Sequence, residues 1–78
     1  MNIDDFILKI EEEFEDIAPG SLKAESKFRE AFEWNSVNAL IFIALVSNEY
    51  DVAITAKDIE SSNTINDLFN IVKSRVAK

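Results

Sequence analysis

The sequence predicts an all-α protein, a small four-helix bundle with a long loop between its first and second helices and a short third helix. Apolar residues recur at steps of three and four along most of the chain, which is the spacing of helices that bury one face. The 78 residues include one glycine and one proline, whereas hairpin-rich folds need many glycines for positive φ. The length fits one domain, which we expect to span residues 1–78.

The first helix is predicted from apolar residues that lie on one face between Ile3 and Ile17. Asn2 suits the N-cap position, and the acidic first turn complements the positive end of the helix dipole. Pro19-Gly20 is expected to end this helix.

A long connection follows at residues 18–35, where no apolar period is sustained. Within it we expect Ser26 to Phe32 to form a single turn with Ser26 as its cap. Trp34 is expected to be a partly buried plug rather than a recognition residue.

The most apolar element, Ser36 to Asn48, is predicted to be a central helix that is buried on more than one side and capped by Asn35. Its face is set by residues at helical spacing, namely Val37, Leu40, Ile41, Ala44 and Leu45. Three more apolar residues widen that face, namely Phe42, Ile43 and Val46. A buried strand is the alternative for this run, but the length and the cap favour a helix.

Two segments that are typical of capping boxes begin the remaining helices. Thr55 to Asp58 starts a short helix that ends near Ser61-Ser62, and Thr64 to Asp67 starts the last helix, whose apolar residues again step by three and four up to Val76. The helices and the long loop are expected to share one core, formed by Phe6, Ile7, Ile10, Phe14, Leu22, Phe28, Phe32, Leu40, Ile43, Ala44, Ile54, Ile59, Leu68, Phe69 and Val72.

The composition excludes several function classes. Without cysteine or histidine, cysteine nucleophiles, serine–histidine dyads and zinc sites built on these residues cannot form, which excludes a stand-alone hydrolase of those kinds. The net charge of −7 makes nucleic acids and anionic membranes poor partners. The apolar run that ends at Val46 is far shorter than the roughly 18 residues of a membrane span, and the N-terminus lacks a secretory signal, so we expect a cytoplasmic protein.

Ser36 is the candidate site residue. It follows the Asn35 cap and opens the most apolar helix, so its hydroxyl is expected beside unpaired backbone N–H groups at the positive end of the helix dipole. A phosphoryl group attached there would occupy an anion-binding position. Spacing alone favours a structural serine, since serine is common in first turns.

Three segments share their spacing with a known family. Phe28 to Phe32, with Ser36 four residues later, is similar to that family's loop leading to a modified serine. Tyr50-Asp51 and Ile54 are similar to the end of its second helix, and Thr64 to Leu68 is similar to the start of its last helix. In these segments, and in size, acidic balance and helix order, the chain resembles the acyl carrier proteins.

This resemblance implies a carrier rather than an enzyme, so we expect no catalytic residue and no metal site. It implies that Ser36 carries 4′-phosphopantetheine, donated by coenzyme A through a separate Mg²⁺-dependent phosphopantetheinyl transferase, and that the thiol of this arm holds acyl groups as thioesters. The implied pathway is fatty acid or related lipid or polyketide biosynthesis, with acyl-transfer or synthase enzymes as partners. We expect a monomer that binds neither nucleic acid nor membrane.

The chain departs from the family pattern around Ser36. The usual Asp-Ser-Leu triplet is Asn35-Ser36-Val37 here, and Glu33 stands where a glycine is common. Residues 35–48 contain no charge, although the family's second helix carries acids that dock on basic patches, whereas residues 1–16 hold seven acidic side chains and one basic one. Because rim charges mostly set association rate and partner choice, a specialised partner set is expected, docking through Ile41 or the first helix.

Other hypotheses stay open. One is an unmodified helical protein-interaction module that keeps the carrier fold, which the uncharged second helix and the Asn-Ser-Val triplet motivate. Another is a DNA-binding helical bundle, which the acidic charge disfavours. The acidic first helix also fits a merely solubilising surface.

Overall fold

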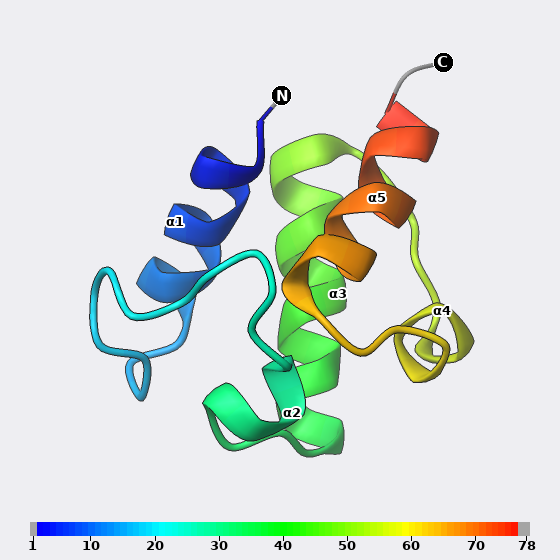
Figure 1. The fold of residues 1–78 in the computed structure, drawn as a ribbon. Helices are drawn as coiled ribbons and strands as arrows, with labels where there is room; N and C mark the ends of the chain where they lie inside the picture. The colour runs from blue at the N-terminus through cyan, green and yellow to red at the C-terminus, as the bar shows by residue number, and fades with distance from the viewer. Residues whose placement is uncertain (1, 77–78) are drawn as a thin grey trace.

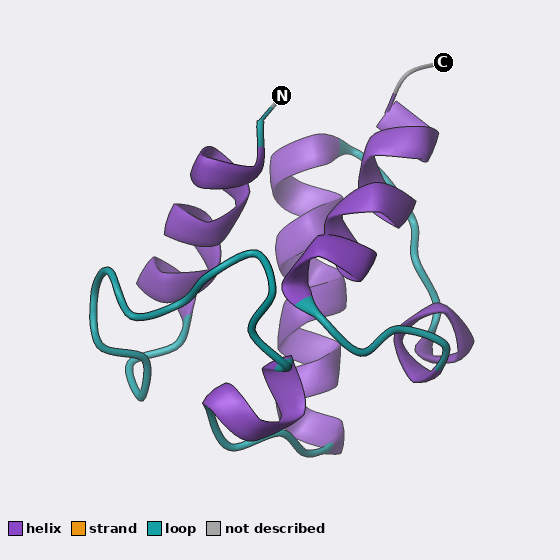
Figure 2. Ribbon diagram, in the orientation of Figure 1, coloured by secondary structure: helices purple, strands orange, loops and turns teal. Residues whose placement is uncertain are grey.

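A computed structural model of the protein describes residues 2–76, in which five helices and no strands occur. The helices, in chain order, are α1 (Ile3–Glu13), α2 (Phe28–Ala31), α3 (Ser36–Tyr50), α4 (Ala56–Glu60) and α5 (Ile65–Val76). The long helices α1, α3 and α5 lie side by side, and α2 lies at the N-terminal end of α3 (Figures 1 and 2). The short helix α4 packs against α5. The all-α prediction is confirmed, and none of these helices has the length and apolarity to cross a membrane.

The start of α1 agrees with the sequence prediction, but its end does not. Asn2 caps the helix by accepting a hydrogen bond from the Asp5 amide at 2.9 Å. The helix ends at Glu13, not at Pro19-Gly20, because Phe14 adopts an extended conformation. The last turn of α1 has no basic side chain, so nothing offsets the negative end of its dipole, and the acids that follow oppose further growth.

The apolar spacing nevertheless continues past this end, because Phe14 and Ile17 are both buried although only turns connect them. Glu11 then draws the returning loop against α1. Its carboxylate accepts hydrogen bonds from the amides of Gly20 at 3.1 Å and Leu22 at 3.0 Å. One acid of the charged surface therefore has a structural role.

The single turn expected in the long loop is α2, but its predicted cap is wrong. Lys27 occupies the N-cap position without a side-chain hydrogen bond. The Ser26 hydroxyl instead accepts a hydrogen bond from the Lys23 amide at 2.9 Å, and the Ser26 carbonyl accepts one from the Ile65 amide at 3.0 Å. The segment before α2 is therefore tied to the start of α5.

The core forms around one aromatic ring. Phe6 of α1 lies 6.0 Å from Phe42 of α3 and 5.5 Å from Phe69 of α5, measured between ring centroids, and both contacts are edge-on. Edge-on pairs at such distances stabilise a core beyond the area they bury. Val46, one turn after Phe42, is fully buried. The three long helices therefore meet at Phe6.

The predicted buried face of α3 is partly wrong. Leu40 is 65% exposed and Ala44 is also exposed, whereas Phe42, Leu45 and Val46 are buried. The reason is that α3 is apolar on all sides, so its spacing does not indicate which side meets the bundle. Two other expected core residues are partly buried, namely Ile7 and Ile43. The remaining members of the predicted core are confirmed as buried, namely Phe6, Ile10, Phe14, Leu22, Phe28, Phe32, Ile54, Ile59, Leu68, Phe69 and Val72.

Both predicted capping boxes are present. Thr55 and Asp58 exchange hydrogen bonds between side chain and backbone amide at the start of α4, at 2.8 and 3.2 Å. Thr64 and Asp67 do the same at the start of α5, both at 3.1 Å. Arg75 of α5 adds a forked ion pair to Asp58, with its two nitrogens 2.7 and 3.0 Å from the carboxylate oxygens. The start of α4 is therefore anchored on α5.

Replacing Phe42 and Leu40 separately tests the observed face of α3. Phe42→Ala should lower the free energy of unfolding by about 3 to 5 kcal/mol, because it opens a cavity where three helices meet. Leu40→Ala should lower it by less than about 1 kcal/mol, because this side chain is mostly in water already. Chemical denaturation of both variants measures the difference, and equal losses would contradict the observed face.

The pH dependence of the free energy of unfolding tests the ion pair between Asp58 and Arg75. The Arg75 guanidinium and the Thr55 amide hold the pKa of the Asp58 carboxyl well below its usual range. Because the pKa of the Asp58 carboxyl is lower in the folded than in the unfolded protein, its ionised form stabilises the fold fully above the unfolded pKa of about 4. This stabilisation is lost as the pH falls toward the folded pKa. Asp58→Asn should therefore cost roughly 1 to 3 kcal/mol at pH 7.

The gap between the unfolding free energies of wild type and Asp58→Asn should narrow steadily as the pH falls from about 5 to about 2, because the Asp58 carboxyl of the unfolded chain takes up a proton over this range while that of the folded chain stays ionised. Denaturation curves over that pH range measure the gap. A gap that stays constant to the acid limit would show that the ion pair does not stabilise the fold.

Candidate functional site

Ser36 is the first residue of α3, and its side chain is exposed. The predicted cap is confirmed, because Asn35 accepts a hydrogen bond from the Asn38 amide at 2.8 Å. The backbone amides of Ser36 and Val37 make no hydrogen bond to any of residues 2–76. Both amides lie at the positive end of a 15-residue helix, so the position favours an anion attached to the Ser36 hydroxyl.

Hydrogen bonds to Glu33 and the packing of Trp34 hold the segment before Ser36 in place. The Glu33 carbonyl accepts a hydrogen bond from the Asn38 side chain at 2.5 Å, and the Glu33 carboxylate accepts one from the Asn35 side chain at 3.3 Å. Trp34 is half-buried, with its ring 4.8 Å from Phe28, which confirms the predicted plug. The direction from which the chain enters α3 is therefore fixed by neighbouring residues.

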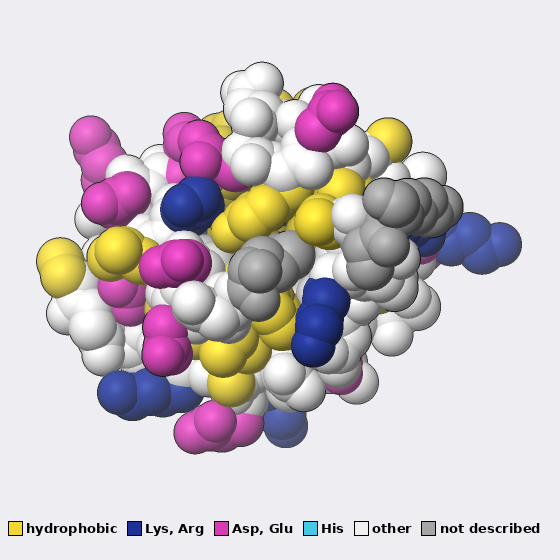
Figure 3. Space-filling view, turned by 90° about the horizontal axis from the view of Figure 1, so that it is seen from above, with side chains coloured by type: hydrophobic (Ala, Val, Ile, Leu, Met, Phe, Trp, Pro, Cys, Tyr) yellow, Lys and Arg dark blue, Asp and Glu magenta, His cyan; other side chains and the backbone are white. Residues whose placement is uncertain are grey.

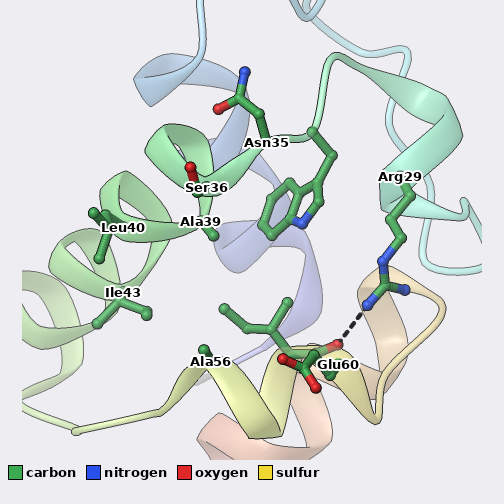
Figure 4. Close-up of a pocket in the computed structure, with 10 residues that line it drawn as sticks. Arg29, Asn35, Ser36, Ala39, Leu40, Ile43, Ala56 and Glu60 are labelled. Carbon is green, nitrogen blue, oxygen red and sulfur yellow. Dashed lines mark hydrogen bonds between the residues drawn. The ribbon is translucent and has the colours of Figure 1, made fainter.

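A surface cavity of about 460 Å³ lies beside Ser36. Ala39 and Ile43 of α3 line one side of it, and Ala56 and Ile59 of α4 line the other (Figure 4). Its lining is mainly apolar, and Trp34 closes part of it toward α2. The structure thus places an apolar space next to the hydroxyl, between elements about 20 residues apart in the sequence.

Arg29 holds the α4 side of this cavity in place. Its guanidinium donates hydrogen bonds to the carbonyl oxygens of Ser62 at 2.6 Å and Ile59 at 2.9 Å, and Figure 4 shows it reaching from α2 toward α4. It also stacks on Phe28, with 4.5 Å between the guanidinium carbon and the ring centroid. Sequence analysis did not single out Arg29, because its partners lie about 30 residues away and no local pattern indicates them.

The acids of residues 13–16 lie on the side of α3 that faces away from the cavity beside Ser36. Glu13, Glu15 and Asp16 line a second cavity, of about 290 Å³, together with Asn38 and Ile41 of α3. Viewed from the end at which both termini lie, acidic side chains gather on the side of α1 (Figure 3). The acidic surface and the uncharged helix are therefore neighbours.

The described residues contain no cluster of three or more acidic side chains that is arranged to hold a metal ion. Ser36, the expected site residue, is placed beside one cavity and the acidic loop is placed beside another. The arrangement offers a hydroxyl, two backbone N–H donors and an apolar space, which suits the attachment of a phosphate-linked group.

Comparison with known proteins agrees with this chemistry. A sequence model of the family described as phosphopantetheine attachment site matches residues 5–72. No curated protein matches the chain at an accepted level of significance. The match confirms the resemblance, the all-α fold class and the expected prosthetic group. The chain therefore belongs to the phosphopantetheine attachment site family, and it is a carrier domain rather than a catalyst.

Proposed function

We propose that this chain is an acyl carrier protein in which Ser36 bears 4′-phosphopantetheine, acting as a single carrier domain over residues 1–78. The position of Ser36 is the observation that carries this proposal. Its hydroxyl is exposed at the start of the longest helix and makes no hydrogen bond to the described residues 2–76. A group joined there can extend into solvent or along the neighbouring cavity.

The other serines suit attachment less well. Four of them donate their hydroxyl hydrogen to a backbone carbonyl, namely Ser21, Ser61, Ser62 and Ser74. Ser26 accepts a hydrogen bond from the Lys23 amide. Ser47 lies near the C-terminal end of α3, where the negative end of the dipole disfavours a phosphodiester. Ser36 alone combines an exposed hydroxyl with the positive end of a long helix.

The Ser36 side chain supplies the oxygen for attachment. Its Oγ forms a bond to the phosphorus next to pantetheine in coenzyme A, the pyrophosphate bond to adenosine 3′,5′-bisphosphate breaks, and the hydroxyl proton passes to a base of the transferase. The amides of Ser36 and Val37 then stabilise the negative charge of the phosphodiester. The arm supplies the thiol that this cysteine-free chain lacks.

The cavity beside Ser36 favours an apolar cargo. Its volume of about 460 Å³ lies within the range of small-molecule sites, roughly 300 to 1,000 Å³. Ala39 and Ala56 are small side chains on facing helices, so they leave room for a chain between α3 and α4. These features support a role in fatty acid or related lipid or polyketide biosynthesis, with acyl-transfer or synthase enzymes as partners.

An unmodified interaction module is the second candidate function. The uncharged residues 35–48 and the Asn35-Ser36-Val37 triplet favour it, since both differ from the acyl carrier pattern. The exposed, unbonded Ser36 hydroxyl favours the carrier instead. A protein without the arm in its own cell, bound to a stable partner, would support the module.

Incubation with coenzyme A, Mg²⁺ and a panel of broad-specificity phosphopantetheinyl transferases tests the attachment site. Wild type should gain the mass of one phosphopantetheinyl group, measured on the intact protein. Ser36→Ala should gain none, whereas Ser47→Ala, a serine variant in the same helix, should gain as much as wild type. No gain by wild type with any transferase, or a gain that persists in Ser36→Ala, would refute the proposal.

Acylation of the arm tests the cavity. An octanoyl thioester should raise the melting temperature of wild type above that of the same protein with a free thiol, because the chain buries apolar surface between α3 and α4. Ala39→Phe fills this space and should abolish the increase. Differential scanning calorimetry of the four species measures it, and an equal increase in both proteins would place the chain elsewhere.

A further inference from the structure

Trp34 separates the cavity beside Ser36 from the aromatic core. Its side chain lines the cavity. The centroid of its ring also lies 4.8 Å from that of Phe28, 5.7 Å from that of Phe32 and 6.3 Å from that of Phe42, and all three contacts are edge-on. All three phenylalanines are buried. Removing the indole would therefore open the cavity toward the core.

Trp34 and Arg29 close the cavity at the N-terminal end of α3. The helix α2 lies at this end (Figure 1), and Arg29 reaches from it toward α4 (Figure 4). The Arg29 guanidinium donates to the carbonyl oxygens of Ile59 and Ser62, so moving it aside would leave both carbonyls without these bonds. Trp34 is held by its three ring contacts. This end of the cavity is therefore rigid.

The other end of the cavity is open to water. Leu40 is 65% exposed, and Ala56, across the cavity on α4, is also exposed. Figure 4 shows Leu40 and Ile43 on the far side of the cavity from Arg29. A chain carried by the arm therefore enters at this open end and points its free end toward Trp34.

The length of the cavity sets how much of such a chain it can cover. The α3 residues that line it extend from Ser36 to Ile43. At a rise of about 1.5 Å per residue, this part of α3 is about 10 Å long. An extended chain covers about 1.2 Å per covalent bond, so about eight bonds fit along the cavity.

We propose that this carrier holds medium-length acyl chains of up to about eight carbons, and that Trp34 sets this limit. The proposal rests on the proposed attachment of the arm to Ser36 and on the proposed cargo space between α3 and α4. Later carbons of a longer chain stay in water, because the indole blocks the way to the buried phenylalanines. Trp34 is thus a specificity-determining residue that acts by contact with the end of the cargo.

The test measures melting temperature against chain length. A phosphopantetheinyl transferase loads the protein from butanoyl, hexanoyl, octanoyl, decanoyl and tetradecanoyl coenzyme A, and intact mass confirms each loading. The increase in melting temperature over the free-thiol form should grow up to octanoyl and then stay level. Each methylene that enters the cavity adds buried apolar surface, whereas those beyond the limit add none.

Two variants of Trp34 should move this limit. Trp34→Leu shortens the side chain that closes the cavity and keeps it apolar, so the increase should continue to decanoyl or beyond. Trp34→Phe makes a smaller change in the same direction and serves if Trp34→Leu does not fold. Each acylated variant is compared with its own free-thiol form, so the packing that the substitution loses cancels.

Phe69→Leu is the matched control. It removes a ring from a buried position that contacts Phe6 and is not among the residues lining the cavity. This variant should be less stable than wild type, but its increase should still level off at octanoyl. A general loosening of the core would instead extend the limit in both kinds of variant.

The fluorescence of Trp34 reports the contact directly, because the 78 residues contain no other tryptophan. Indole emits at shorter wavelength when apolar groups replace water around it. The wild-type emission should therefore shift to shorter wavelength as the chain lengthens, and the shift should be complete at octanoyl. A purely structural role of Trp34 would leave the emission independent of chain length.

The outcomes distinguish this proposal from those on which it rests. If no transferase adds the arm to wild type, the attachment at Ser36 is refuted and the length limit falls with it. If the arm is added but no acyl chain changes the melting temperature or the emission, the cargo space is refuted as well as the limit.

Three results would overturn the role of Trp34 alone. One is a wild-type increase that continues beyond octanoyl. Another is a limit that stays at octanoyl in both Trp34→Leu and Trp34→Phe. The third is a limit that Phe69→Leu extends as far as the Trp34 variants do.

Discussion

The packing of α3 through Phe42 and Val46 determines how the other long helices are arranged. Phe42 is 1% exposed and Val46 is fully buried, and Phe6 brings α1 and α5 against the same side of α3. A domain of this size buries only part of its surface, and the side of α3 that carries Leu40 and Ala44 stays exposed. Because α3 is apolar all round, its opposite side stays apolar and uncovered, and Ser36 lies at the end of that side.

Polar contacts hold α4, which lines the cavity beside Ser36, in addition to the core packing of Ile59. Arg75 pairs with Asp58 at the start of α4, and Arg29 caps its end through the carbonyls of Ile59 and Ser62. Two cations from different helices thus set the position of a five-residue helix that is too short to be stable alone. The space beside Ser36 exists because α4 is fixed at both ends while Ala56 keeps its side chain small.

Local features of the fold were predictable from the sequence, and features that depend on distant partners were not. The caps at Asn35, Thr55 and Thr64 join residues three apart, so their patterns are visible in the sequence. The exposure of Leu40 was not predictable, because an apolar stripe around a whole helix does not indicate its partner side. The role of Arg29 depends on contacts with residues about 30 positions away, which no local pattern encodes.

The proposed carrier role depends on attachment of phosphopantetheine to Ser36, at the uncovered end of α3. Fragmentation of the intact protein purified from its own cell tests this most directly, because it reports both the mass of the attached group and the residue that carries it. We expect a phosphopantetheinyl mass, with or without an acyl group, on fragments that contain Ser36. An unmodified native protein, or the same mass on fragments that lack Ser36, would contradict it.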